Sequence, residues 1–205
     1  MKKIILSAAA LFVFGFANAQ DATTATGGGD AKGFAKGDIF MSGSAGFSSE
    51  STGDDKLNSF EISPSLGFFV SDNIAIGALL SYTSTKDETP GVEDIDTNAL
   101  AIGVFGRYYA TPASDFSFFG ELGAAYVMAK QEQGSAEGKA NGFVIAFSPG
   151  VSYFISSNFA LEASIGELSY TTVKPDNDLP GEESTDTFKL NLDLTDIMVG
   201  LVYKF

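Results

Sequence analysis

Residues 58–70, NSFEISPSLGFFV, alternate between large apolar side chains and small or polar ones. One face carries Phe60, Ile62, Pro64, Leu66, Phe68 and Val70. The other face carries Ser59, Glu61, Ser63, Ser65 and Gly67. Successive side chains of a β-strand point to opposite sides, so a period of two residues predicts a strand with one apolar face.

The same alternation runs along the chain from Asp38 onward. It predicts eight antiparallel strands, over residues 38–48, 57–70, 74–84, 97–109, 116–128, 142–154, 159–170 and 187–205. Short connections at 71–73, 110–115 and 155–158 alternate with longer ones at 49–56, 85–96, 129–141 and 171–186. We therefore expect an all-β fold, an eight-stranded antiparallel up-and-down barrel with its tight turns at one rim.

The seventh strand changes phase near Gly166-Glu167. Leu161 and Ile165 lie on one parity, whereas Leu168 and Tyr170 lie on the other. One extra residue re-phases a strand in this way, so we predict a β-bulge at this point.

Alternation alone would also describe a soluble β-sandwich or a lipocalin-like barrel. Here, however, the large face is the apolar one, and the other face holds Gly, Ala, Ser and a few charges. That face is too small and too polar for the core of a water-soluble protein, whereas a barrel in lipid is apolar on the outside. Tyrosines also stand near both ends of the strands, as expected for aromatic girdles at the headgroup levels. They are Tyr82, Tyr108, Tyr126, Tyr153, Tyr170 and Tyr203. The pattern therefore favours a transmembrane β-barrel.

The N-terminus has the layout of an export signal. Lys2 and Lys3 precede an apolar run over residues 4–16, and Ala17-Asn18-Ala19 forms a small-x-small cleavage site. This layout predicts a secretory signal peptide over residues 1–19, since the apolar run is too short to span a bilayer. Residues 20–37 are rich in Ala, Thr and Gly and predict a flexible leader, which places the barrel domain at residues 38–205.

The composition excludes several function classes. Twelve Lys and Arg stand against 26 Asp and Glu, and the net charge of −14 disfavours nucleic acid as a partner. The chain has no cysteine and no histidine. It therefore lacks disulfides, thiol catalysis, imidazole metal sites and a Ser-His-Asp triad. We expect no catalytic residues, no metal site and no cofactor.

The C-terminal residues carry a resemblance to a known family. Ile197, Val199, Leu201, Tyr203 and Phe205 alternate up to a terminal aromatic residue. This ending resembles the β-signal of bacterial outer-membrane proteins, which implies that Tyr203 and Phe205 are read by the barrel assembly machinery. Residues 38–205 as a whole resemble the small eight-stranded outer-membrane barrels of the OmpA/OmpX-like superfamily, in the motifs Ser63-Pro64, Arg107-Tyr108-Tyr109, Gly120-Glu121 and Ser148-Pro149. The resemblance implies an outer-membrane location and contact with lipid.

Three charged residues are expected inside the barrel. Arg107, the only arginine of the sequence, shares the small-residue face with Glu121 and Glu162, each a few residues from a short turn. We expect the three to meet near the periplasmic rim, with Arg107 opposite Glu121. They would form either an ion-pair plug or, alternatively, a pair of catalytic carboxylates or a gate in an ion path. Catalysis is disfavoured because an eight-stranded lumen is too narrow for a sugar chain, and no histidine is present as a base.

The long connections carry most of the acidic residues. Residues 84–97 and 171–186 each contain one lysine against five Asp or Glu. The charged side chains keep these loops solvated. Alternatively, their carboxylates bind divalent cations that bridge them.

Our hypothesis is a monomeric, non-enzymatic outer-membrane barrel with an envelope-structural role, or a role in binding an unidentified cell-surface ligand. The alternatives are a narrow channel for ions or small apolar solutes, and an exported soluble binding barrel.

Overall fold

The computed structural model describes residues 32–176, 184–191 and 198–205. These residues form β1 (Ile39–Thr52), β2 (Asp55–Phe69), β3 (Ile74–Glu88), β4 (Ile95–Tyr109), β5 (Phe116–Gln133), β6 (Ala136–Phe154), β7 (Phe159–Ser164), β8 (Glu167–Pro175), β9 (Thr185–Asn191) and β10 (Met198–Lys204). Within these described ranges, no helix has the length and apolar character needed to cross a membrane.

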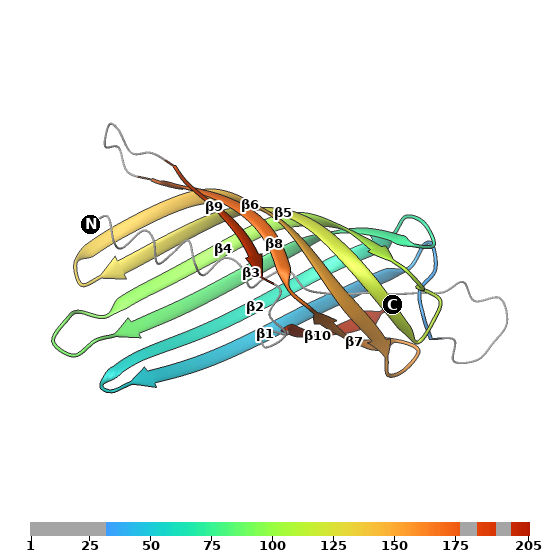
Figure 1. Ribbon diagram of the computed structural model, residues 1–205, viewed down its shortest axis with the longest axis horizontal. Helices are drawn as coiled ribbons and strands as arrows, with labels where there is room; N and C mark the ends of the chain where they lie inside the picture. The colour runs from blue at the N-terminus through green and yellow to red at the C-terminus, as the bar shows by residue number, and fades with distance from the viewer. Residues whose placement is uncertain (1–31, 177–183, 192–197) are drawn as a thin grey trace.

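The strands close into a barrel (Figure 1). Each strand from β1 to β6 pairs antiparallel with the next, and β6 then pairs with both β7 and β8. β9 continues the sheet beside β8, and β10 joins β7 to β1 and closes the ring. β7 and β8 follow each other along one wall. β10 and all of β9 except Thr185 and Asp186 fall in the last predicted strand, 187–205. The predicted eight-stranded up-and-down barrel is thus confirmed.

The break between β7 and β8 is the predicted bulge. Gly150 pairs with Ser164, but Phe147 pairs with Leu168, so residues 165–167 face the shorter segment 148–149. Gly166 has a φ of 98°, in the left-handed region that glycine tolerates best. The extra residue turns Glu167 inward and Leu168 outward, so both parts of the wall keep apolar side chains on the lipid side.

The strands run further than the sequence predicted on the side of the long connections. Residues 49–56 and 129–141 were expected to be loops, but most of them lie in the β1–β2 and β5–β6 hairpins. The turns are tight, with positive φ at Gly53 (65°) and Gly134 (56°). The prediction is wrong because these segments are hydrophilic on both faces, so the apolar alternation that marks the strands in the membrane does not extend into them. A hairpin that extends into water needs no apolar face, because cross-strand ion pairs such as Lys130–Glu137, at 3.0 Å, can stabilise it.

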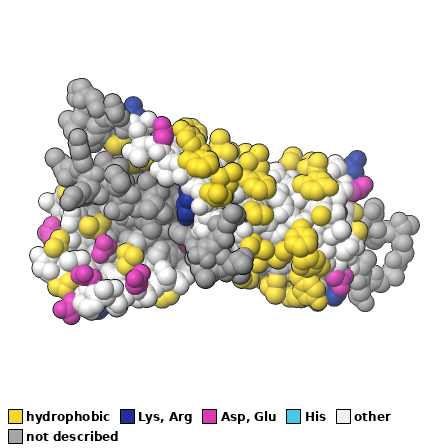
Figure 2. Space-filling view, viewed as in Figure 1, with side chains coloured by type: hydrophobic (Ala, Val, Ile, Leu, Met, Phe, Trp, Pro, Cys, Tyr) yellow, Lys and Arg dark blue, Asp and Glu magenta, His cyan; other side chains and the backbone are white. Residues whose placement is uncertain are grey.

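The outer surface divides into two zones (Figure 2). Hydrophobic side chains cover the barrel from its middle toward the short turns, whereas charged side chains lie beyond this zone at both ends, including the end formed by the β1–β2, β3–β4 and β5–β6 hairpins. Outward-facing Val104, Phe118 and Leu122 are each more than half exposed, while inward-facing Ser63, Ser81 and Ser148 are buried. The inside-out pattern predicted from the alternation is therefore confirmed.

The inward aromatic rings fit into the narrow barrel because glycines lie opposite them. Phe40 pairs with Gly67, Phe105 with Gly77 and Phe119 with Gly150. A Cβ added at any of these three glycines would overlap the ring of its partner. Glycine at these positions is therefore a packing requirement of the interior.

We predict that Gly77→Ala destabilises the barrel by about 1–3 kcal/mol, because the added methyl group overpacks a filled interior. Gly106→Ala is the matched control, since an added Cβ there has no neighbour within 4 Å. Denaturant unfolding in detergent measures both variants. Equal stabilities of the two variants would contradict the packing requirement.

Candidate functional site

The three charged residues expected inside the barrel lie together in the lumen. Arg107 on β4 pairs directly with Glu121 on β5, and Glu162 projects from β7. Their exposed fractions are 1%, 3% and 2%, so all three are buried. We call Arg107, Glu121 and Glu162 the interior charge cluster.

The three nitrogens of the Arg107 guanidinium together bond three residues. Nε donates a hydrogen bond to Glu121 Oε2 at 2.8 Å, and Nη2 donates to the same oxygen. Nη1 donates to Glu162 Oε2 at 3.0 Å and to the Tyr109 hydroxyl at 2.7 Å. One side chain therefore ties β4 and β5 to β7 through the interior.

Aromatic rings surround the guanidinium. Its Cζ lies 4.6 Å from the ring centroid of Phe119, 5.3 Å from that of Phe105 and 5.8 Å from that of Tyr109. Such cation–π contacts are strengthened where the cation is desolvated. These rings were not predicted to surround Arg107, although they share the parity of Arg107 and Glu121 along β4 and β5.

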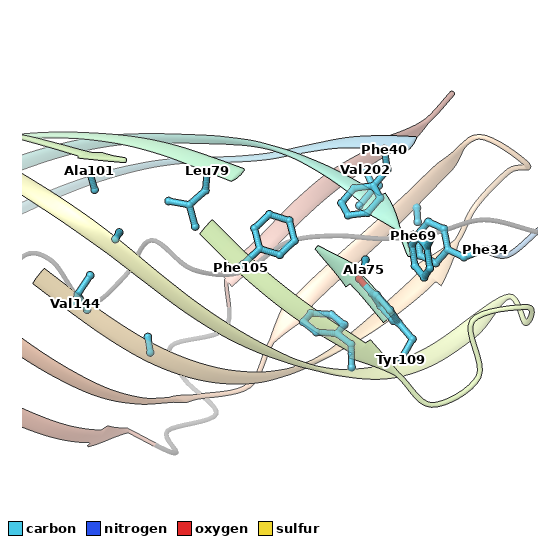
Figure 3. Close-up of a cluster of buried hydrophobic side chains, with 14 of the residues drawn as sticks. Phe34, Phe40, Phe69, Ala75, Leu79, Ala101, Phe105, Tyr109, Val144 and Val202 are labelled. Carbon is cyan, nitrogen blue, oxygen red and sulfur yellow. The ribbon is translucent and has the colours of Figure 1, made fainter. Parts of the chain in front are cut away.

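A second group of aromatic residues closes the rim at the short turns (Figure 3). We call it the mouth cluster, and it consists of Phe34, Phe40, Phe69, Tyr109 and Phe154. Phe34 is at its centre and stacks on Phe69 with ring centroids 4.5 Å apart. Tyr109 belongs to this cluster and also bonds Arg107, so the aromatic and charged groups form one continuous filling.

Phe34 lies in the segment that the sequence analysis assigned to a flexible leader. The described residues 32–37 instead contact the barrel: Phe34 N donates to Pro112 O at 2.8 Å, and Lys204 Nζ donates to Gly33 O at 3.2 Å. Gly33 has a φ of 113°, and a Cβ there would lie 2.7 Å from the Ala113 carbonyl carbon. The signal peptide and the rest of the leader, residues 1–31, lie outside the described residues and stay predictions.

The rim beside this segment carries a perturbed acid. Burial raises the pKa of the Asp38 carboxyl to about 6, although the nearby Lys204 ammonium acts to lower it. Asp38 Oδ2 is buried without a hydrogen-bond partner among the described residues. Ionisation of Asp38 is therefore less favourable at this rim than in water.

The two residues expected to form the assembly signal lie at the same end of the barrel. The Tyr203 ring is 5.0 Å from that of Phe159 and 5.1 Å from that of Phe205. Phe205 N donates to Ile39 O at 3.1 Å, while its side chain is 64% exposed. The backbone of Phe205 is thus held by β1 and its ring remains accessible.

The acidic segments above the apolar zone hold local ion pairs. Lys86 Nζ lies 2.7 Å from both Glu88 Oε1 and Asp94 Oδ2, and hydrogen bonds to Asp94 and Glu88 hold its pKa above the usual range. In the part of the chain that the structure describes, no three acidic side chains form a group that could hold a metal ion. Residues 177–183 of the second acidic segment lie outside that part.

The sequence matches the family of the outer membrane protein beta-barrel domain over residues 6–205. The chain belongs to this family. Among solved structures, it resembles OprG from Pseudomonas aeruginosa, with a TM-score of 0.54 and 16% identity over 84% of this chain and 98% of that one. It also resembles Neisserial surface protein A (NspA), with a TM-score of 0.50 and 16% identity over 82% of this chain and 97% of that one. No curated protein matches the sequence. The protein is therefore an outer-membrane β-barrel protein, and its belt of exposed apolar side chains contacts membrane lipid.

We predict that Phe34→Ala lowers the free energy of unfolding by about 3 kcal/mol, since it removes a large side chain from the centre of the mouth cluster. Phe47→Ala is the matched control, because Phe47 faces outward and is 76% exposed. Denaturant titration in the same detergent compares the two. If both substitutions cost the same, the segment around Phe34 is not part of the packed barrel.

Proposed function

We propose that the protein is a non-enzymatic outer-membrane barrel with a closed lumen that acts through the surface it presents outside the membrane. The observation that carries this proposal is the bridge from Arg107 to both Glu121 and Glu162. Eight strands leave an interior just wide enough for side chains to fill. The interior charge cluster and the mouth cluster together occupy that interior near the rim with the short turns.

The outer end of the barrel supports a structural or surface-interaction role. The β1–β2, β3–β4 and β5–β6 hairpins extend beyond the apolar belt and carry charged side chains into water (Figures 1 and 2). A rigid, charged surface of this kind suits contact with other envelope components or with a cell-surface ligand. We propose that the protein does so as a monomer, since the aromatic and apolar belt needs only lipid to cover it.

One observation favours the alternative of a narrow, gated channel. Glu162 receives one hydrogen bond from the Arg107 Nη1 atom, whereas Glu121 receives two hydrogen bonds from the same guanidinium. Movement of Arg107 away from Glu162 would therefore break a single bond of the guanidinium. A gate of this kind would pass small ions along the inner wall.

We predict that Arg107→Ala destabilises the barrel by about 3–5 kcal/mol, because it leaves two buried carboxylates without a cation. The triple change of Arg107, Glu121 and Glu162 to Leu removes every charge and is expected to be close to neutral. Denaturant unfolding in detergent gives both values.

Single-channel recording in planar bilayers separates the two functions. A closed scaffold gives no conductance in the wild type. The gate hypothesis predicts that Arg107→Ala raises conductance while the stability stays unchanged. That combination would contradict the closed lumen.

We also propose that the barrel assembly machinery reads Tyr203 and Phe205. The Phe205 ring is accessible, and it follows the end of β10, where the Phe205 backbone is hydrogen-bonded to β1. Both observations support this proposal. Phe205→Ala should lower the amount of inserted barrel several-fold and leave export intact. Phe116→Ala is the control, because Phe116 is an outward aromatic residue at the start of β5, at the same rim. Heat-modifiable gel migration of membrane fractions measures insertion, and equal insertion of the two variants would contradict the proposal.

A further inference from the structure

We propose that the inner wall formed by β6 and β7 binds a small monovalent cation. The ligands are one oxygen of Glu162 and the hydroxyls of Ser152 and Ser164. This site lies beside the interior charge cluster, but it uses oxygen atoms that the Arg107 bridge leaves free.

The three oxygens come from neighbouring inward positions. Ser152 on β6 pairs directly with Glu162 on β7, and Ser164 is the next inward residue along β7. Side chains at directly opposed positions have Cβ atoms about 5 Å apart. Their exposed fractions are 2% for Ser152, 2% for Glu162 and 6% for Ser164, so bulk water does not reach them freely.

None of these three oxygens has a hydrogen bond of ordinary geometry to a described residue, although the Ser152 hydroxyl lies close to the Glu162 carboxyl. Glu162 Oε1, Ser152 Oγ and Ser164 Oγ are buried without a hydrogen bond in the described part of the chain. Buried polar atoms are almost always paired, because an unpaired one loses its hydration without compensation. Three such atoms at adjacent positions therefore indicate a bound group that all of them contact.

The charge balance gives the sign of that group. When Glu121 and Glu162 are both ionised, the single guanidinium of Arg107 that bridges them leaves the cluster with a net charge of −1. A buried charge without a counter-ion is strongly unfavourable. Glu162 Oε2 already accepts from Arg107, whereas Oε1 does not. The missing positive charge belongs at Oε1.

The donor set selects a monovalent ion. Carboxylate and hydroxyl oxygens are hard ligands, and one net negative charge balances one positive charge. Ca²⁺ and Mg²⁺ favour more oxygen ligands and commonly more carboxylates. The described residues hold no group of three acidic side chains that would supply them. Sodium and potassium ions, with water completing the coordination, fit the three oxygens.

The polar wall continues from this site along β8. Glu167 Oε1 and Ser169 Oγ are also buried without a hydrogen bond of ordinary geometry in the described ranges, although the two side chains lie close to each other. The bulge at Gly166 turns Glu167 into the lumen. A cation that enters from the end with the long β5–β6 hairpin would pass these oxygens before it reaches Glu162.

The test is thermal unfolding of the full chain in detergent at pH 8, with NaCl or KCl compared with choline chloride at the same ionic strength. Choline carries its charge on a fully alkylated nitrogen, so oxygen ligands cannot coordinate it closely. We expect the small cations to raise the Tm of the wild type by about 2–4 °C relative to choline. Glu162→Gln should abolish this difference, whereas Glu132→Gln, on an exposed carboxylate of β5, should preserve it.

A second variant keeps the charge and removes only ligands. The double change Ser152→Ala, Ser164→Ala should fold and should reduce the Tm difference at least two-fold. Crystals grown with Rb⁺ should show an anomalous peak beside Glu162 in the wild type and none in Glu162→Gln. Equal Tm values in NaCl and choline chloride, or a Tm that changes with pH but not with the cation, would overturn the proposal. In the second case a proton balances the charge.

Discussion

The whole structure depends on filling the interior of an eight-stranded barrel. The lumen is too narrow to hold bulk water along its length and too polar to collapse as an apolar core. Arg107 meets this constraint, because its guanidinium bonds Glu121 and Glu162 and lies against the rings of Phe105 and Phe119. A long planar cation with several donors can contact carboxylates and aromatic faces together, which a lysine cannot do equally well.

The other interior features follow from the same constraint. Glycines such as Gly77 and Gly150 stand opposite the inward rings because a second side chain would not fit. Phe34 completes the filling at the rim from outside the barrel strands. Because the lumen is filled in this way, we infer that the outer hairpins meet other molecules, and we propose the buried oxygens of Glu162, Ser152 and Ser164 as a site for a small ion.

The sequence was sufficient to predict the barrel, because lipid on one side and a narrow lumen on the other impose a strict period of two. That period also placed Arg107 opposite Glu121 and located the bulge near Gly166. It did not predict where β5 ends and β6 begins, at the turn that joins them. Beyond the membrane a strand needs no apolar face, so a hydrophilic hairpin has the same composition as a loop. Nor did it predict the packing of Phe34, because a single aromatic residue in a Gly-rich leader has no periodicity. The similar distances of the three charges from the short turns also predicted that Glu162 meets Arg107, whereas the atoms that form the hydrogen bond depend on how the barrel closes.

The most direct test of the central claim is a double-mutant cycle between Arg107 and Glu162, which lie on β4 and β7. The unfolding free energies of the wild type, Arg107→Met, Glu162→Gln and the double variant are measured in one detergent. Side chains that share an ion pair show a coupling energy of about 0.5–3 kcal/mol, whereas independent ones are additive within about 0.5 kcal/mol. We predict a coupling of at least 1 kcal/mol, at the scale of a desolvated charge-assisted hydrogen bond. Additive effects of the two substitutions would contradict the bridge through the lumen.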